Sequence, residues 1–320
     1  MLAITGCTGF IGGRLLAHRL PPARLLVRRA DFEAPAGCEL VRGTLEDRAA
    51  RERLLVGAEV VLHLAGAIAA PNPEGFMRVN AEATAALVRE AAACGVRRFI
   101  LVSSLAARHP DVSWYGLSKR RAEEAAREEA GRMELVIVRP PAVYGPGDRA
   151  TLDIFRALHR GWLPAPAVPQ ARFALLYVDD LARLLKALAT TEKPPREVLE
   201  PCDGKAEGYR WRDVAEIAAR ILERPVRLLP VPRPIAFAAA WLADRWADWS
   251  GRPSPLPRDR VRQFYHPDWR CRGGCWSGWR PEVGFAEGFR RTSDWYLRAG
   301  WLKGRARRPS RGNGEHDDQG

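Results

Sequence analysis

The sequence predicts an α/β fold, a doubly wound parallel sheet with a smaller C-terminal substrate-binding region. Six short runs rich in leucine and β-branched residues occur in the first 140 or so positions, and segments with helical periodicity separate most of them. The runs are almost continuously apolar, which is typical of strands buried on both faces of a parallel sheet. After Arg139 the texture changes, and proline-rich breaks recur along the chain.

Each element is expected where its residue pattern begins and ends. The expected strands cover residues 2–5, 24–28, 39–42, 60–65, 99–103 and 135–139. The expected helices cover residues 11–19, 47–55, 74–93, 114–129, 179–189 and 211–223. Right-handed crossovers would place the connecting loops at the carboxyl ends of the strands, where ligands bind in such sheets.

The change of texture predicts two regions and a tail. Residues 1–148 should form the first domain, and a segment around residues 172–200 should return to it. Residues 149–302 should form most of the substrate-binding region. The segment 304–320 is polar and aperiodic, so we expect it to be disordered.

One helical segment in the second region has an apolar stripe. Its members are Ile235, Ala238, Leu242, Trp246 and Trp249. The segment is too short to span a bilayer. Packing within the C-terminal region is the favoured interpretation, and a lid or an interfacial helix near an apolar substrate is the alternative.

Charge and cysteine content narrow the partners. The 320 residues carry a net charge of +13, but the arginines are spread evenly among acidic residues and no nucleic-acid module is visible. We therefore expect phosphates of a small cofactor, and no nucleic acid, as the anionic partner. No signal peptide or run of ~20 apolar residues is readable, which favours the cytoplasm. The sequence leaves open a homodimer and peripheral contact with a membrane.

The six cysteines are scattered, which fits a reducing compartment. Cys271 and Cys275, with His266 upstream, suggest zinc as an alternative, but paired C-x2-C ligands are missing. We therefore expect no metal site.

A glycine-rich turn follows the first expected strand and opens the first helix. Its three glycines would allow a tight turn, close approach of a pyrophosphate to the backbone, and close packing of helix on strand. Amides at the start of the helix would face the phosphates. This predicts a Rossmann-type dinucleotide site at Gly6, Thr8, Gly9, Phe10, Ile11 and Gly12.

The end of the second strand bears on the choice of cofactor. Arg28 and Arg29 stand where an acidic residue would bind the ribose of NAD, and two arginines suit a 2′-phosphate. NADP is therefore favoured over NAD, although Asp31 could still serve as a ribose acceptor.

Tyr115 and Lys119 lie four apart near the start of a helix and share one face. A phenol with a pKa near 10 exchanges protons at neutral pH only with help, and a neighbouring ammonium lowers its pKa. We expect Tyr115 to be the general acid/base and its pKa to be lowered by Lys119 and a nicotinamide charge. Lys119 would also hold the ribose, and Ser104 would hydrogen-bond the reacting oxygen.

With these motifs in order, the sequence resembles the extended short-chain dehydrogenase/reductase superfamily, of NAD(P)-dependent epimerase/dehydratase type, over residues 1 to about 302. Residues 5–12 are similar to its TGxxGFxG turn, residues 63–66 to its H-L-A strand end, and residues 139–148 to its RPxxVYGPGD segment. Val79-Asn80, Ser103-Ser104, the Tyr115–Lys119 pair and Tyr177–Asp180 follow the family's order as well. The resemblance implies that Asn80 supports the active-site backbone. It also implies cofactor contacts at Leu45, Leu64, Ala65, Gly66 and Pro140.

Two departures shape the functional expectation. Ala142 replaces the Asn by which nucleotide-sugar enzymes of the family contact their substrate, and Thr44 replaces an Asp that often meets the adenine. The double proline at 140–141 resembles instead the 3β-hydroxysteroid dehydrogenase and dihydroflavonol-reductase-like members, which act on bulky apolar substrates. Asp179 and Asp180 start a helix, where we expect them to cap its amides and favour its dipole rather than to act in catalysis.

The leading hypothesis is therefore an NAD(P)(H)-dependent oxidoreductase that interconverts a ketone and a secondary alcohol on an apolar small molecule. A nucleotide-sugar epimerase or dehydratase is the first alternative. A non-catalytic dinucleotide-binding subunit is the second.

Overall fold

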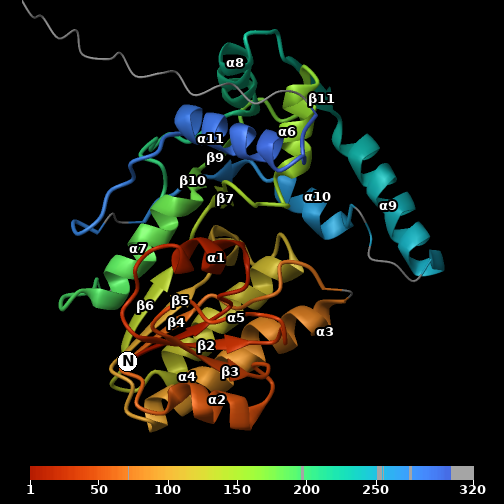
Figure 1. Ribbon diagram of the computed structural model, residues 1–320. Helices are drawn as coiled ribbons and strands as arrows, with labels where there is room; N and C mark the ends of the chain where they lie inside the picture. The colour runs from red at the N-terminus through yellow and green to blue at the C-terminus, as the bar shows by residue number, and fades with distance from the viewer. Residues whose placement is uncertain (71, 196–197, 251–253, 255, 274–275, 304–320) are drawn as a thin grey trace, which may run out of the picture.

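The computed structural model describes residues 1–70, 72–195, 198–250, 254, 256–273 and 276–303 (Figure 1). Its centre is a six-stranded parallel sheet in the order β3-β2-β1-β4-β5-β6. The strands are β1 (Leu2–Thr5), β2 (Ala23–Val27), β3 (Cys38–Arg42), β4 (Val60–His63), β5 (Arg98–Val102) and β6 (Glu134–Val138). The predicted fold class is confirmed, and every predicted strand is present.

Apolar side chains fill both faces of this sheet, as the continuous apolar strands require. On one face pack α1 (Phe10–Leu16) and α7 (Val178–Thr190), and on the other α2 (Arg48–Leu55), α4 (Ala83–Ala93) and α5 (Trp114–Glu129). The segment before α4 consists of α3 (Pro73–Phe76) and a π-helical turn, η1 (Met77–Glu82). A parallel bridge between Val138 and Leu199 adds a later segment to the edge of the sheet.

The later part of the chain lies above the carboxyl ends of the strands (Figure 1). It holds three two-stranded parallel pairs, β7 with β10, β8 with β11, and β9 with β12. These strands are β7 (Ala142–Tyr144), β8 (Trp162–Pro166), β9 (Arg172–Phe173), β10 (Leu175–Tyr177), β11 (Arg227–Val231) and β12 (Asp268–Trp269). The helices are α6 (Leu152–His159), α8 (Trp211–Leu222), α9 (Arg233–Ser250), α10 (Arg258–Phe264) and α11 (Phe285–Arg298). The predicted disordered tail, 304–320, lies outside the described residues.

The expectation for Asp179 and Asp180 holds only in part. Both lie in the first turn of α7, where acidic residues favour the helix dipole, and both have structural partners, but neither carboxylate caps that helix. Asp179 binds Arg14 of α1 through two hydrogen bonds of 2.7 Å, and Asp180 accepts from the backbone amides of Glu282 and Val283. Both carboxylates therefore join α7 to separate segments, and Asp180 also accepts a hydrogen bond from Arg183 of its own helix.

The apolar stripe of α9 is not packed into the C-terminal region, contrary to the favoured interpretation. Ile235, Leu242, Trp246 and Trp249 are 44–85% exposed, and Ala238 is exposed as well. In Figure 1, α9 extends away from the body of the molecule. Within the described residues, none of the helices combines the length and apolarity needed to span a membrane.

Candidate active site

The glycine-rich turn between β1 and α1 fits closely against the end of β4. Gly6 has a φ of +74°, and a Cβ there would lie 2.5 Å from the amide nitrogen of Ala65. A Cβ on Gly12 would lie 2.3 Å from the carbonyl oxygen of Gly6. Thr8 and Gly9 at the tip are exposed, and Phe10 and Ile11 begin the helix half-buried. Glycine is required at both positions, and no side chain caps the start of α1, so the first amides of that helix are the groups that would bind a phosphate.

The two arginines after β2 are exposed. Arg29 pairs with Asp31, with donor–acceptor distances of 3.1 and 2.6 Å, so the two groups that were expected to compete for the ribose bind each other. Leu45, expected near the adenine, is buried, and its carbonyl accepts a hydrogen bond from Arg51.

Asn80 holds the loop that follows β4. It lies in η1 and is 1% exposed. Its side chain accepts from the amide of Ala67 at 2.7 Å and donates to the carbonyl of Ala67 at 3.0 Å and to Ser118 Oγ at 2.9 Å. This tethers the loop of Leu64, Ala65 and Gly66 to α5. The π-helical turn was not visible in the sequence, which predicted one regular helix over 74–93.

Gly66 lies directly against α5. A Cβ on Gly66 would lie 3.0 Å from Lys119 Nζ and 3.1 Å from Asn80 Oδ1. A larger residue here would displace the ammonium group. The loop after β4, the π-helical turn and α5 thus meet at Gly66, Asn80 and Lys119.

The start of α5 is fixed on two sides. Ser113 caps the helix by accepting from the amide of Gly116 at 2.9 Å. A Cβ on Gly116 would lie 2.7 Å from the carbonyl of Ala106, so only glycine lets α5 approach η2 (Leu105–Arg108) so closely. Ser104 caps η2, and its hydroxyl hydrogen-bonds the Tyr115 phenol. Pro140 lies beside them, since its carbonyl accepts from the amide of Leu105.

Burial shifts the pKa values of both Lys119 and Tyr115. Lys119 is 6% exposed, and its Nζ donates to the carbonyl of Val102 at 3.0 Å. Burial lowers the pKa of Lys119 to about 8, and Glu123 opposes this shift. The expectation of a lowered pKa for Tyr115 is wrong for the protein alone. Burial raises the pKa of this phenol, and the hydrogen bond from Ser104 opposes the rise without cancelling it.

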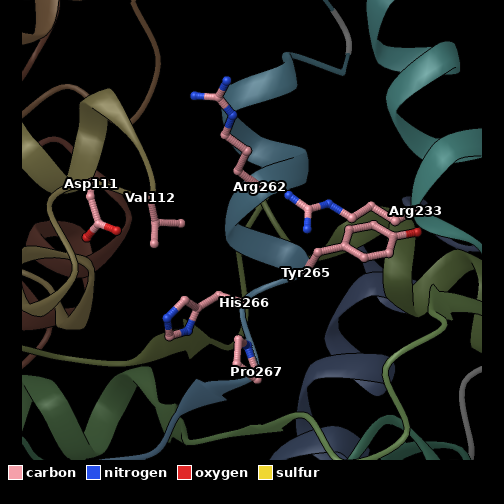
Figure 2. A pocket seen from close by; sticks show the side chains of 7 residues that line it. All are labelled: Asp111, Val112, Arg233, Arg262, Tyr265, His266 and Pro267. Atoms are coloured by element: carbon pink, nitrogen blue, oxygen red, sulfur yellow. The ribbon is translucent and has the colours of Figure 1, made fainter.

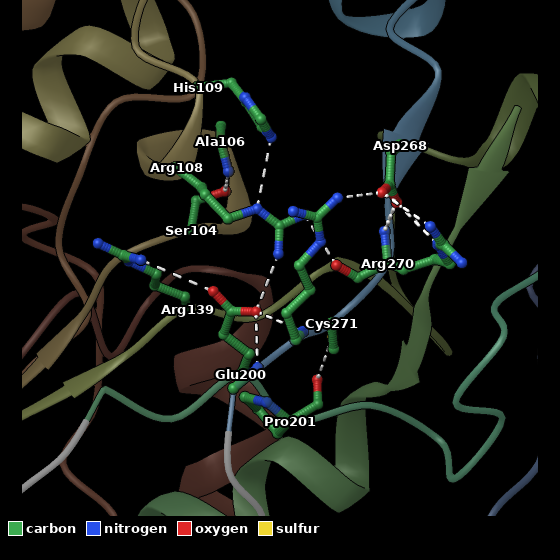
Figure 3. Close-up of polar contacts among 12 residues, drawn as sticks. Ser104, Ala106, Arg108, His109, Arg139, Glu200, Pro201, Asp268, Arg270 and Cys271 are labelled. Carbon is green, nitrogen blue, oxygen red and sulfur yellow. Dashed lines mark hydrogen bonds and ion pairs between the residues drawn. The ribbon is translucent and has the colours of Figure 1, made fainter.

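Behind Tyr115 and Lys119 lies a buried ionic network that was not predicted from the sequence. Glu123, fully buried and one turn beyond Lys119, accepts from Arg139 at 2.8 and 2.6 Å and from Ser103 at 2.6 Å. Arg139 also approaches Glu200, which binds Arg108 at 3.0 Å (Figure 3). The i+4 spacing from Tyr115 through Lys119 to Glu123 was the available signal. This network joins α5, η2 and the segment after β12.

His63 is fully buried, and its ring nitrogens lie 2.6 Å from Thr5 Oγ1 and 2.8 Å from Thr84 Oγ1. Burial, with a smaller effect of Lys119, lowers its pKa to about 3. A ring that stays neutral supports the strand ends and exchanges no protons in the physiological range. Cys271 faces Cys202 and the carbonyl of Pro201, while Cys275, the other half of the zinc alternative, lies outside the described residues.

A pocket of about 360 Å³ opens between the loop that leads into α5 and the C-terminal region (Figure 2). One side consists of Asp111 and Val112, and the other carries cationic and aromatic groups. The residues of that second side are Arg233, Arg262, Tyr265, His266 and Pro267. The pocket therefore lies between α9, α10 and the residues just before Tyr115.

Two curated relatives align with nearly the whole chain. The chain is 39% identical over 309 residues to a ceramide reductase of Caulobacter vibrioides, covering 94% of this chain and 96% of that protein. It is 26% identical over 326 residues to a UDP-glucose 4-epimerase of Vibrio cholerae, covering 93% and 96%.

Solved structures share the fold. The UDP-glucose 4-epimerase of Thermus thermophilus in complex with NAD has a TM-score of 0.64 and 20% identity, covering 92% of this chain and 98% of that one. The enzyme WbmG of Bordetella bronchiseptica in complex with NAD has a TM-score of 0.66 and 18% identity, covering 94% and 95%.

The sequence profile of the NAD dependent epimerase/dehydratase family matches residues 2–199. This match agrees with the parallel sheet, with the glycine-rich turn and with the 39% identity to a reductase over nearly the full length of both chains. The chain belongs to the NAD dependent epimerase/dehydratase family and is an NAD(P)-dependent oxidoreductase.

Proposed function

We propose that this enzyme reduces a ketone to a secondary alcohol on a long-chain lipid of the ceramide class. The observation that carries the reaction type is the convergence of Ser104, Tyr115 and Lys119 beside Gly66 at the end of β5. Residues 1–148 would bind the cofactor, and residues 149–302 would supply most of the substrate site.

The residues of the chain have separate tasks in this reaction. NAD(P)H, once bound by the glycine-rich turn, would supply the hydride for the new C–H bond. Ser104 orients the carbonyl oxygen by a hydrogen bond, and Tyr115 donates its proton to that oxygen as negative charge develops there. The raised pKa of Tyr115 keeps the phenol protonated and ready to donate. Lys119, held by the carbonyl of Val102, stabilises the phenolate that remains and would hold the ribose.

Three features support an apolar substrate. The 39% identical relative is named for ceramide, an N-acylated long-chain base with a secondary hydroxyl group, and the ketone at that carbon is the matching substrate for reduction. Ala142 offers no side-chain hydrogen bond to a sugar nucleotide. The exposed aromatic helix α9 also begins at the pocket beside the loop that leads into α5. A nucleotide-sugar epimerase is the second candidate, because a UDP-glucose 4-epimerase aligns over 93% of this chain.

A direct comparison of substrates tests the proposal. The full chain is incubated with NADPH or NADH and a keto-ceramide in detergent micelles, and product is followed by mass spectrometry. UDP-glucose and other nucleotide sugars serve as competitors and as alternative substrates. We expect conversion of the ketone to the alcohol and no turnover of the sugars. Turnover of a nucleotide sugar with an inert keto-ceramide would contradict the proposal and support the epimerase.

The preference for NADP is a finer proposal. Arg28 and Arg29 are exposed near the position of the ribose 2′-oxygen in this fold, and Arg29 would have to leave Asp31 to bind a phosphate. We expect the double substitution Arg28→Ala/Arg29→Ala to weaken NADPH binding by about 10- to 100-fold. NADH binding should hardly change. Fluorescence titration measures both, with Arg220→Ala as the exposed control. A parent enzyme that prefers NADH would refute the preference.

A further inference from the structure

Two cysteines that are far apart in the sequence lie in contact near the edge of the sheet. Cys202 comes shortly after Leu199, which pairs with β6, and Cys271 comes just after β12. The sulfur of Cys271 lies 3.6 Å from the carbonyl oxygen of Pro201, the residue before Cys202, and the two thiols hydrogen-bond each other (Figure 3). Both thiols are free and half-buried, so solvent can reach the pair.

Glu200 holds the two segments that carry these cysteines. Its Oε2 atom accepts from the amide of Arg272 at 2.7 Å and from the amide of Gly273 at 3.1 Å, the two residues that follow Cys271. The carboxylate itself lies two residues before Cys202. The backbone therefore brings the thiols together without a bond between them, and a disulfide would need no large movement of either segment.

The surroundings favour a thiolate on Cys202. The hydrogen bond from Cys271 lowers the pKa of Cys202 to about 7, burial opposes this shift, and the backbone amide of Gly204 adds to it. The same hydrogen bond raises the pKa of Cys271, which therefore keeps its proton. Burial raises the pKa of both Cys7 and Cys38, so neither offers a thiolate of this kind. A thiolate beside a second thiol is the arrangement in which disulfides form and exchange.

We propose that Cys202 and Cys271 are a modification site at which a peroxide forms a reversible disulfide. The Cys202 thiolate attacks one oxygen of hydrogen peroxide, the O–O bond breaks, and a sulfenic acid and hydroxide result. The Cys271 thiol then attacks the sulfenic sulfur and loses its proton, and water leaves as the S–S bond forms. The two thiols lose two electrons, which reduce the peroxide to water. A small thiol such as glutathione would reverse the modification by exchange.

The disulfide would close a loop that contains much of the second region. The chain between Cys202 and Cys271 forms α8, β11, α9, α10 and β12. Within this loop, Gln263 of α10 donates at 2.7 Å to Ser113, the residue that caps α5. The bond would thus tie these elements to the edge of the sheet. Because a cross-link restricts the unfolded chain, the oxidised protein should melt at a higher temperature than the reduced protein.

Mass spectrometry of the full chain, reduced and then treated with a small excess of hydrogen peroxide, tests the proposal. We expect the mass to fall by two hydrogens, a digest without reductant to contain a Cys202–Cys271 link, and glutathione to restore both thiols. Cys202→Ser should slow the loss of thiols at least about tenfold. Cys271→Ser should stop at a sulfenic acid on Cys202, which dimedone traps. Cys94→Ser, at an exposed cysteine, is the matched control and should form the link like the parent.

Thermal melting establishes that each variant is folded, and Cys271→Ala replaces Cys271→Ser should the serine variant unfold. A parent that keeps all its thiols, or a link from either cysteine to Cys275 or to a second chain, would overturn the proposal. An oxidised parent that melts no higher than the reduced parent would also overturn it, since the site would then not suit the bond. None of these measurements uses a substrate, so failure of the proposed reduction would leave their outcome unchanged.

Discussion

Helices α5 and α9 have similar lengths, 16 and 18 residues, and opposite relations between chemistry and burial. In α5, the charged side chains of Lys119 and Glu123 are buried. In α9, tryptophan and leucine side chains are exposed. Each helix departs from the rule that charges lie outside and large apolar groups inside.

The two departures have different physical consequences. A buried charge is tolerated only where partners compensate it, and Glu123 has Arg139, Ser103 and the more distant Arg127 around it. The exposed stripe of α9 needs no compensation within the chain and adds little to folding. The contrast shows that α5 carries buried charges that need partners within the chain, whereas the stripe of α9 is exposed to contacts outside it.

The largest expected effect is on catalysis by α5. Tyr115→Phe removes the hydroxyl that would donate the proton, so turnover of the keto-lipid should fall by about 10²–10⁴-fold. Cofactor binding and melting temperature should stay near those of the parent, because one oxygen is lost. Steady-state rates and cofactor titration measure the two effects. Activity within a few-fold of the parent would remove Tyr115 from the role of general acid.

The second effect is on the stability that the buried charges provide. Glu123→Leu leaves the buried Arg139 without its closest carboxylate and should lower the free energy of unfolding by about 3–5 kcal/mol. Glu124→Gln is the matched control, because its pairs with Arg120 and Arg121 lie at the surface and should contribute less than about 1 kcal/mol. Denaturant unfolding measures both. Equal losses would show that burial does not distinguish the two carboxylates.

The third effect is a pH dependence specific to Lys119. Its pKa is about 8 in the folded protein and 10.5 as the ordinary value, so the unfolded chain binds more protons between these two pH values. The contribution of Lys119 to stability should therefore rise as pH increases from about 8 toward 10.5. Unfolding of the parent and of Lys119→Met across this range isolates that contribution as a difference. A difference that does not change with pH would show that the ammonium is not desolvated.

The smallest effect concerns the exposed stripe. Leu242→Ala should change the free energy of unfolding by less than about 0.5 kcal/mol, because truncating this exposed side chain removes few packing contacts. Leu87→Ala in α4, a fully buried position, should cost about 2–5 kcal/mol. Denaturant unfolding of both variants gives the comparison. A large loss at Leu242 would mean that the stripe supports the fold after all.

Much of the sheet half could be predicted because its signals are local. The expected strand over 2–5 and the helix over 114–129 coincide with β1 and α5, and the expected strand over 24–28 begins and ends one residue after β2. Apolar runs and helical periodicity are properties of residues close together in the sequence, so they predict the same elements that the folded chain contains. The glycine-rich turn could be predicted for the same reason. Gly6 is required by a local turn, and Gly12 is required because a helix packs directly against the strand that precedes it.

Local patterns of residues were enough to predict the class of fold, the order of the six strands along the chain and the residues that meet at Tyr115. The remaining features depend on how distant segments pack together. Asp179 and Asp180 accept hydrogen bonds from Arg14 and from the amide of Val283, which lie far from them in the sequence. The pKa of Tyr115 is raised by burial, although its spacing from Lys119 predicted a lowered pKa. The apolar stripe of α9 has the same pattern whether a neighbour covers it or not. Only the placement of α10 on the other side of that helix decided that the stripe faces outward, because periodicity records which residues share a face and says nothing of what lies against it.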